Sequence, residues 1–235
     1  MSLLDLQGLS KSFGGIVAAD DIDLSLETGE LHCLIGPNGA GKSTLFKLIV
    51  GLIKPQSGKV VLNGRDITRT QPYQRARLGI SMKYQTTRVF SNLTLGQNIT
   101  VARSRRPLNG DHLDWALRHL DLAGRWAEPV STLSYGEQHW LEMCMALGNQ
   151  PSLVLMDEPT AGMTPDETSR TAVLLKELNR RGLTIIVIEH DMSFVREIAS
   201  QVTVLHQGRT FRQGSLAEIE RDREVQRIYL GEAHA

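Results

Sequence analysis

The sequence predicts an α/β protein in which a mixed sheet forms the core and a helical segment is inserted into it. Short apolar runs alternate with helical spacing at both ends of the chain, whereas β signals fade between residues 86 and 149. The 235 residues, 41% of them hydrophobic and 22% charged, are enough to bury a substantial core. We therefore expect one domain over residues 1–235, with a core at 1–85 and 150–235 and a helical subdomain at 86–149.

The first third of the chain predicts a strand, a helix and a hairpin. Glu30–Ile35 is a short apolar strand, and Lys42–Leu52 carries apolar residues at helical spacing. Val60–Leu62 and Arg65–Ile67 flank an Asn-Gly pair at 63–64, which supplies the positive φ of a hairpin turn.

Alternation of strands and helices returns after residue 150. Leu153–Met156 is typical of a buried strand, and Thr184–Ile188 is a β-branched one. Between them, Thr164–Glu167 opens a helix with a capping box and a proline at the first helical position, and Gly182 ends that helix.

The remaining predicted elements lie in the inserted segment and at the end of the chain. Helical spacing recurs around Leu113–Leu122 and Leu141–Leu147. The chain then finishes with a strand at Val202–Leu205, a Gln-Gly turn at 207–208 and one last helix capped by Ser215 and Glu218.

Composition disfavours several function classes. Lys+Arg and Asp+Glu number 26 each, so no global field points to nucleic acid or an anionic membrane. No apolar run approaches the roughly 18 residues of a membrane span, and residues 1–5 lack the features of a signal peptide. We expect a cytosolic protein, with Cys33 and Cys144 as small core residues rather than disulfide partners or metal ligands.

A phosphate-binding loop is predicted between the first apolar strand and its helix. Residues 36–43, GPNGAGKS, fit the pattern G-x-x-x-x-G-K-[ST], and the strand–loop–helix context disfavours an ordinary glycine-rich turn. Glycines let backbone N–H groups cradle phosphate oxygens, and the helix N-terminus adds positive charge. In this pattern Lys42 neutralises the β/γ-phosphates and the Ser43 hydroxyl ligates Mg²⁺. The expected ATP-binding residues of the loop are Gly36, Pro37, Asn38, Gly39, Ala40, Gly41, Lys42, Ser43 and Thr44.

Two carboxylates end the apolar strand at 153–156. Asp157 can hold Mg²⁺ through water, and Glu158 can polarise an attacking water as general base. Alone, this pattern usually marks a strand end that meets solvent. In a chain that also carries the loop at 36–43, we interpret it as the second half of a hydrolytic site.

The segment Leu133–Glu137, LSYGE, resembles the L-S-G-G-Q signature of ABC-transporter nucleotide-binding subunits, and it lies between the two phosphate motifs. In that family a P-loop NTPase (RecA-like) core with a mixed sheet carries an inserted helical subdomain. The signature of one subunit covers the γ-phosphate bound to the other, which assigns Ser134, Tyr135, Gly136 and Glu137 to the partner's ATP. Without the resemblance, Ser134 and Glu137 are a capping box, but Gly136 in a first helical turn is unexplained. Tyr135 and Glu137 replace the first Gly and the Gln of the family pattern.

Further positions match the family one by one. Gln85 resembles the glutamine that reaches Mg²⁺ and the attacking water from the loop joining core and helical subdomain. His190 resembles the switch histidine at the γ-phosphate, and its alternative is a solvated histidine at a strand end. Phe13 resembles the aromatic that stacks on adenine, and its alternative is a core residue of the first strand pair. Thr164 stands where many relatives carry Asp, and a role as N-cap is sufficient to explain it.

The resemblance implies an ATPase that uses ATP and Mg²⁺ and dimerises around nucleotide, with itself or with a related cassette subunit. It also implies two membrane permease subunits, indirectly a periplasmic solute-binding protein, no nucleic acid, and a cytoplasmic position on the inner face of the cell membrane. Resemblance to importers of branched-chain amino acids and of urea or short amides is carried by residues 138–142, 161–165, 188–192, 202–208 and 228–232. An exporter subunit is the alternative, because hydrolysis looks alike in both directions of transport. A non-transport ABC-type ATPase is a further alternative, disfavoured by the short stretch between Gln85 and the signature.

Overall fold

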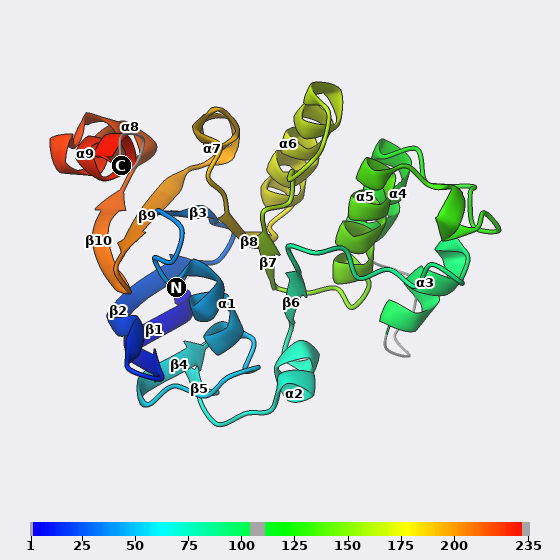
Figure 1. Ribbon diagram of the computed structural model, residues 1–235. Coiled ribbons are helices and arrows are strands. Elements are labelled where there is room, and N and C mark those ends of the chain that lie inside the picture. The colour runs from blue at the N-terminus through cyan, green and yellow to red at the C-terminus, as the bar shows by residue number, and fades with distance from the viewer. Residues whose placement is uncertain (1, 104–110, 232–235) are drawn as a thin grey trace.

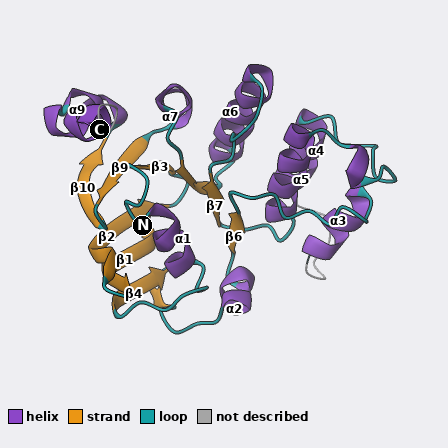
Figure 2. Cartoon of the chain, viewed as in Figure 1, coloured by secondary structure: helices purple, strands orange, loops and turns teal. Residues whose placement is uncertain are grey.

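The computed structural model describes residues 2–103 and 111–231, so residue 232 of the stretch 228–232 lies outside it. Figures 1 and 2 show the arrangement of its helices and strands. In chain order the strands are β1 (Ser2–Phe13), β2 (Ile16–Glu27), β3 (Leu31–Ile35), β4 (Ser57–Leu62), β5 (Arg65–Asp66), β6 (Ile80–Lys83), β7 (Leu153–Asp157), β8 (Thr184–Ile188), β9 (Gln201–His206) and β10 (Arg209–Gly214). The helices are α1 (Lys42–Ile49), α2 (Pro72–Arg77), α3 (Leu95–Ala102), α4 (Asp111–His119), the 3-10 turn η1 (Val130–Thr132), α5 (Tyr135–Leu147), α6 (Pro165–Arg180), α7 (Met192–Ile198), α8 (Leu216–Arg221) and α9 (Arg223–Gly231).

The predicted mixed sheet is present as a six-stranded sheet with the order β10-β9-β3-β8-β7-β6. Neighbouring strands from β9 to β6 run parallel, and β10 pairs antiparallel at one edge. Every residue of β3, β7 and β8 is buried. This explains why these strands read as continuous apolar runs, because helices and a second sheet cover both faces.

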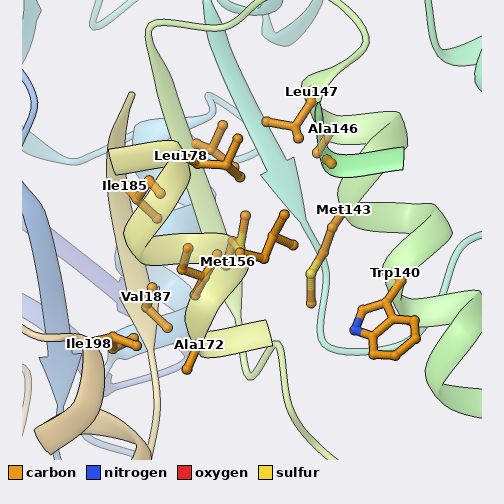
Figure 3. Close-up of a cluster of buried hydrophobic side chains, with 14 of the residues drawn as sticks. Trp140, Met143, Ala146, Leu147, Met156, Ala172, Leu178, Ile185, Val187 and Ile198 are labelled. Carbon is orange, nitrogen blue, oxygen red and sulfur yellow. The ribbon is translucent and has the colours of Figure 1, made fainter. Parts of the chain in front are cut away.

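Alternate residues of the central strands enter two separate cores. Val154 and Met156 of β7 belong to a cluster with α5, α6 and α7, whereas Leu153 and Leu155 belong to a cluster with α1. Figure 3 shows the first cluster, in which side chains from α5 and α6 lie together with those of β7 and β8. The sheet is therefore buried on both faces, and the free cysteines Cys33 and Cys144 lie in the first core as expected.

A second, four-stranded sheet of order β2-β1-β4-β5 encloses α1 from the other side. The hairpin β4–β5 with its turn at 63–64 confirms the sequence prediction. No bounds were predicted for the long antiparallel pair β1–β2, although the alternative role of Phe13 assumed a first strand pair. Register shifts around Leu9 interrupt the two-residue alternation of β1, so its buried and exposed positions do not follow a simple strand pattern.

The helices α3, α4 and α5 lie between β6 and β7 in the sequence, as the prediction of an inserted helical segment requires. They lie to the right of the strands in Figure 1. Arg170 of α6 joins α6 to this segment, because its Nη2 donates to the carbonyl of His119 at 2.6 Å and to Asp121 Oδ2 at 2.8 Å. None of the described helices combines the length and the apolarity needed to span a bilayer.

The C-terminal region differs from the prediction of one last helix. Ser215 caps α8 through the N–H of Glu218, as expected. Asp222 then leaves the helical conformation, and its Oδ1 accepts hydrogen bonds from the N–H groups of Glu224 at 2.8 Å and Val225 at 3.2 Å. The prediction was wrong because an aspartate inside a helical pattern can end one helix and cap the next.

Candidate functional site

The predicted site residues gather at one edge of the six-stranded sheet. Since β3, β6, β7 and β8 run parallel, their carboxyl ends meet at the same edge. The phosphate-binding loop follows β3, Gln85 follows β6, Asp157 and Glu158 end β7, and His190 follows β8. Ligands of open α/β sheets bind outside this edge.

Close backbone approaches fix the phosphate-binding loop. A Cβ added to Gly36 would lie 2.2 Å from the carbonyl oxygen of Leu205, and one added to Gly41 would lie 2.2 Å from that of Ala18. Both glycines also have positive φ, 148° and 103°. Only glycine fits both constraints, so the pattern glycines place the loop against β9 and β2.

The N-terminus of α1 favours the binding of an anion. Its first turn has no acidic residue, and its N-cap Gly41 offers no side-chain cap, so the positive end of the helix is not neutralised from within that turn. The Lys42 Nζ donates to the carbonyls of Gly36 at 2.6 Å and Pro37 at 2.9 Å. Its ammonium group therefore lies at the loop in which a phosphate is expected.

Asp157 and Ser43 form an oxygen-rich pair beside the loop. Burial and the charge of Glu158 raise the pKa of Asp157, while a hydrogen bond from the Ser43 hydroxyl opposes the increase. A hydroxyl and a buried carboxylate are ligands that Mg²⁺ prefers, and a cation would offset the desolvation of Asp157. The two residues thus fit the metal that the sequence predicts.

The Glu158 carboxylate lies between Gln85 and His190. The Gln85 Nε2 donates to Glu158 Oε2 at 2.9 Å, and the His190 Nδ1 is 3.6 Å from Glu158 Oε1. Glu158 adopts the left-handed conformation with φ 45°, which is uncommon for a residue with a side chain and typical of functional sites. A carboxylate held between an amide and an imidazole can orient a water and accept its proton.

Phe13 lies at the end of β1 and is 46% exposed, so the alternative of a core residue is wrong. The Lys11 Nζ lies 5.3 Å from the centre of its ring. The β1–β2 hairpin also reaches the phosphate-binding loop, because Gly41 packs against Ala18 of β2. An exposed ring beside this loop is suited to stacking on a base.

The signature segment, residues 133–137, starts α5. The Ser134 hydroxyl accepts the N–H of Glu137, and the Glu137 carboxylate accepts the N–H of Ser134, which confirms the predicted capping box. Gly136 has a reason within the chain: an added Cβ would lie 2.1 Å from Oε1 of Glu167 in α6. In Figure 1, strands β6 to β8 separate α5 from α1, so the signature segment does not reach the phosphate-binding loop of its own chain.

Several buried charged residues behind the site were not predicted from the sequence. Glu189 is buried at the end of β8, and its Oε1 accepts the Thr160 hydroxyl at 2.8 Å while its Oε2 accepts the N–H of His190 at 3.2 Å. Lys83 of β6 and Glu142 of α5 are buried as well. The only signal in the sequence was a charge next to an apolar run, which is also typical of an exposed strand end.

Comparison with known proteins shows which family the sequence is similar to. Residues 19–161 match the family model described as ABC transporter. The chain is 36% identical to the high-affinity branched-chain amino acid transport ATP-binding protein LivG of Salmonella typhimurium, over 98% of both chains. It is 32% identical to the corresponding protein BraF of Pseudomonas aeruginosa, again over 98% of both. It is 33% identical to the lipopolysaccharide export system ATP-binding protein LptB of Acidithiobacillus ferridurans, over 98% of this chain and 97% of that protein.

Solved structures confirm the fold. A nucleotide-free ATP-binding cassette from an ABC transporter superimposes with a TM-score of 0.88 and 27% identity, over 97% of this chain and 99% of that one. The ADP conformation of a cassette gives a TM-score of 0.87 and 28% identity, over 98% and 99%. A dimeric cassette in a post-hydrolysis state, bound to ADP and phosphate, gives 0.79 and 26%, over 91% and 98%.

Proposed function

The chain belongs to the ABC transporter family, and from this premise we propose that it hydrolyses ATP to drive uptake of a small amino acid or amide. Branched-chain amino acids are the first candidate cargo and urea is the second. The observation that carries the catalytic part is the Glu158 carboxylate, which lies between Gln85 and His190 at the edge that also holds the phosphate-binding loop.

In this proposal, residues 36–44 hold the phosphates of ATP, with Lys42 against their charge and Phe13 against the adenine. Ser43, Gln85 and, through water, Asp157 would hold Mg²⁺, which when bound neutralises charge on the β- and γ-phosphates. Glu158 accepts the proton of the attacking water, and Gln85 orients that water.

His190 would contact the γ-phosphate from the other side of the Glu158 carboxylate. Its neighbour Glu189 accepts the backbone N–H of His190, which fixes the chain at this position. The site is then complete except for groups that cover the γ-phosphate from outside.

We infer that a second cassette supplies those groups. Ser134, Tyr135, Gly136 and Glu137 start α5 away from their own phosphate-binding loop, and a similar cassette is dimeric with ADP and phosphate bound. The partner is a second copy or a related cassette. Closure of such a dimer would move the helical segment 86–149 against two permease subunits, on the inner face of the cell membrane.

The nature of the cargo follows from the relatives alone. LivG and BraF are named for branched-chain amino acid transport, which supports an importer. LptB is named for lipopolysaccharide export at comparable identity, so the direction of transport needs its own experiment.

Replacing the proposed base tests the catalytic part. Glu158→Gln keeps the shape of the side chain but takes up no proton, so we expect ATP hydrolysis to fall by on the order of 100-fold or more while ATP binding is retained. Steady-state phosphate release and titration with a fluorescent ATP analogue measure the two properties. Glu224→Gln, an exposed change on α9, is the control and should behave as wild type. Hydrolysis by Glu158→Gln at the wild-type rate would remove Glu158 from the mechanism.

Uptake by cells tests the cargo. A strain without this chain should lose ATP-driven uptake of labelled leucine or of labelled urea, and a wild-type copy should restore it whereas a Glu158→Gln copy should not. Unchanged uptake of both, together with lost export of a lipid, would favour the exporter over the importer.

A further inference from the structure

A buried lysine lies behind the proposed hydrolytic site. Lys83 is the last residue of β6 and is 0% exposed. It pairs in register with Met156 of β7, so it adjoins the strand end that carries Asp157 and Glu158. Its Nζ donates to the backbone carbonyl of Glu158 at 3.4 Å.

The surroundings of Lys83 are acidic on several sides. The charges of Glu142, Asp157, Glu189 and Glu158 all favour its ammonium form, although burial lowers its pKa. Glu142, Asp157 and Glu189 are themselves buried, and burial raises the pKa of each carboxyl group. Buried carboxylates need a nearby cation, and β6 supplies one through Lys83.

The largest acidic influence on Lys83 from the helical segment is the charge of Glu142 on α5, the helix that begins at the signature segment. Glu142 is the first of the charges that stabilise the ammonium form of Lys83. His139, one turn earlier on α5, is also buried, and neither of its ring nitrogens has a hydrogen-bond partner among the described residues. Burial and the charge of Lys83 hold the pKa of His139 at about 4, so its ring is neutral at pH 7 and adds no second cation beside Lys83.

We infer that Lys83 is a positioning residue for ATP hydrolysis, which holds the backbone of Glu158 in place. The inference rests on the proposed role of Glu158 as general base. The left-handed backbone of Glu158 is unfavourable unless its surroundings hold it, and two donors at its carbonyl do so, the Ala161 N–H at 3.3 Å and the Lys83 Nζ at 3.4 Å. The direction of the Glu158 side chain follows from this backbone, so Lys83 determines where the carboxylate meets Gln85 and His190.

Replacing Lys83 by methionine tests this inference, because methionine keeps an unbranched chain and removes the charge. We expect the kcat of ATP hydrolysis by Lys83→Met to fall roughly 10- to 100-fold, as for a displaced catalytic group, with ATP affinity changed less than about 3-fold. Lys83→Arg returns a cation and should recover part of kcat. Lys176→Met, a half-exposed lysine on α6, is the matched control and should leave kcat unchanged.

A double variant separates positioning from charge compensation alone. Lys83→Met leaves Glu142 without its cation and lowers thermal stability, whereas Lys83→Met/Glu142→Gln removes both charges and should restore the melting temperature. The kcat of the double variant should stay low, because the Glu158 carbonyl still lacks the Lys83 ammonium and keeps only the Ala161 N–H. If the double variant recovered both its kcat and its melting temperature, the inference would be overturned. This test remains valid even if Lys83→Met alone fails to fold, because it needs only the double variant.

The two hypotheses fail in different ways. Wild-type hydrolysis by Glu158→Gln would overturn the role of Glu158 and this inference with it. Loss of hydrolysis in Glu158→Gln, with full kcat in Lys83→Met, would overturn the positioning role alone.

Discussion

His139 shows how one buried residue makes stability depend on pH. Burial, and after it the charge of Lys83, lower its pKa from 6.5 to about 4 in the folded protein. In the unfolded chain the ring takes up a proton near its ordinary pKa. Between pH 6.5 and 4 the unfolded state therefore binds more protons at this site, and the free energy of unfolding falls as the pH decreases through this window.

We expect His139→Gln to lose this dependence. Between pH 7 and 4.5 the wild type should lose roughly 2 to 3 kcal/mol more unfolding free energy than the variant, on the scale of 1.4 kcal/mol per pKa unit. Buried carboxyl groups with raised pKa act in the opposite direction, but they are present in both proteins and cancel in the difference. Urea unfolding at pH 7, 5.5 and 4.5 measures the free energy of unfolding of both proteins. If this free energy changed with pH equally in the two proteins, the lowered pKa of His139 would be contradicted.

At the residue scale, spacing in the sequence predicted which candidate residues gather at one edge of the sheet. The loop at 36–43 and the pair Asp157–Glu158 each follow an apolar strand, so parallel pairing alone brings them to one edge. Lys83 and Glu142 were not predictable in this way. Their burial depends on α5 packing against the end of β6, which is a tertiary contact that no local pattern encodes.

Among the elements, the starts of α5 and α6 depend on each other. The Glu167 carboxylate accepts the N–H of Thr164 at 2.8 Å and its hydroxyl at 3.0 Å, which completes the capping box of α6. The same carboxylate occupies the space in front of Gly136. It cannot retreat without losing the cap, so the glycine of the signature segment is also a packing requirement within one chain.

Gly136→Ala should therefore destabilise α6 rather than α5. We expect a loss of about 1 kcal/mol of unfolding free energy, the usual value of a helix cap. In a Glu167→Ala background the cap is already gone, and Gly136→Ala should then be neutral or slightly stabilising, since alanine is the better helix former. Thermal unfolding of the four proteins of this cycle gives the coupling, and equal effects of Gly136→Ala in both backgrounds would show that the two helices are independent.

The sequence predicted the central strands and the capped helix α6 well. Their signals are local: an apolar run for β7, a β-branched run for β8, and a Thr-Pro-x-Glu start for α6. It did not predict the bounds of β1–β2, where register shifts break the alternation, and it joined α8 to α9 across Asp222. Bulges and mid-helix caps depend on contacts with residues far away in the sequence, so the periodicity of apolar residues does not predict them.

For the molecule as a whole, the proposed ATP site needs a second cassette to complete it. Lys42, Asp157, Glu158 and His190 lie at one sheet edge, while Ser134 starts a helix on the far side of β6 to β8. Association through nucleotide should therefore depend on both surfaces at once.

We expect Glu158→Gln with Mg·ATP to form a two-fold dimer, because ATP is bound but not hydrolysed, and to be monomeric without nucleotide. Ser134→Arg in the same background should abolish the dimer, since a bulky side chain would occupy the place of the partner's γ-phosphate. Ser57→Arg, an exposed change on β4, is the control. Light scattering reports the mass, and the same mass under all conditions would remove the basis for the paired site.

The order of the strands also has a consequence for synthesis of the chain. Among the described strands, β3, which leads into the phosphate-binding loop, pairs with β8 and β9: Leu31 lies opposite Ile185, and His32 opposite Gln201. Both partners are translated roughly 150 residues later, which takes on the order of 10 to 30 s at ribosomal speed. During this time a strand with four apolar residues out of five has no sheet to join, so the nascent chain exposes an aggregation-prone segment until its last third leaves the ribosome.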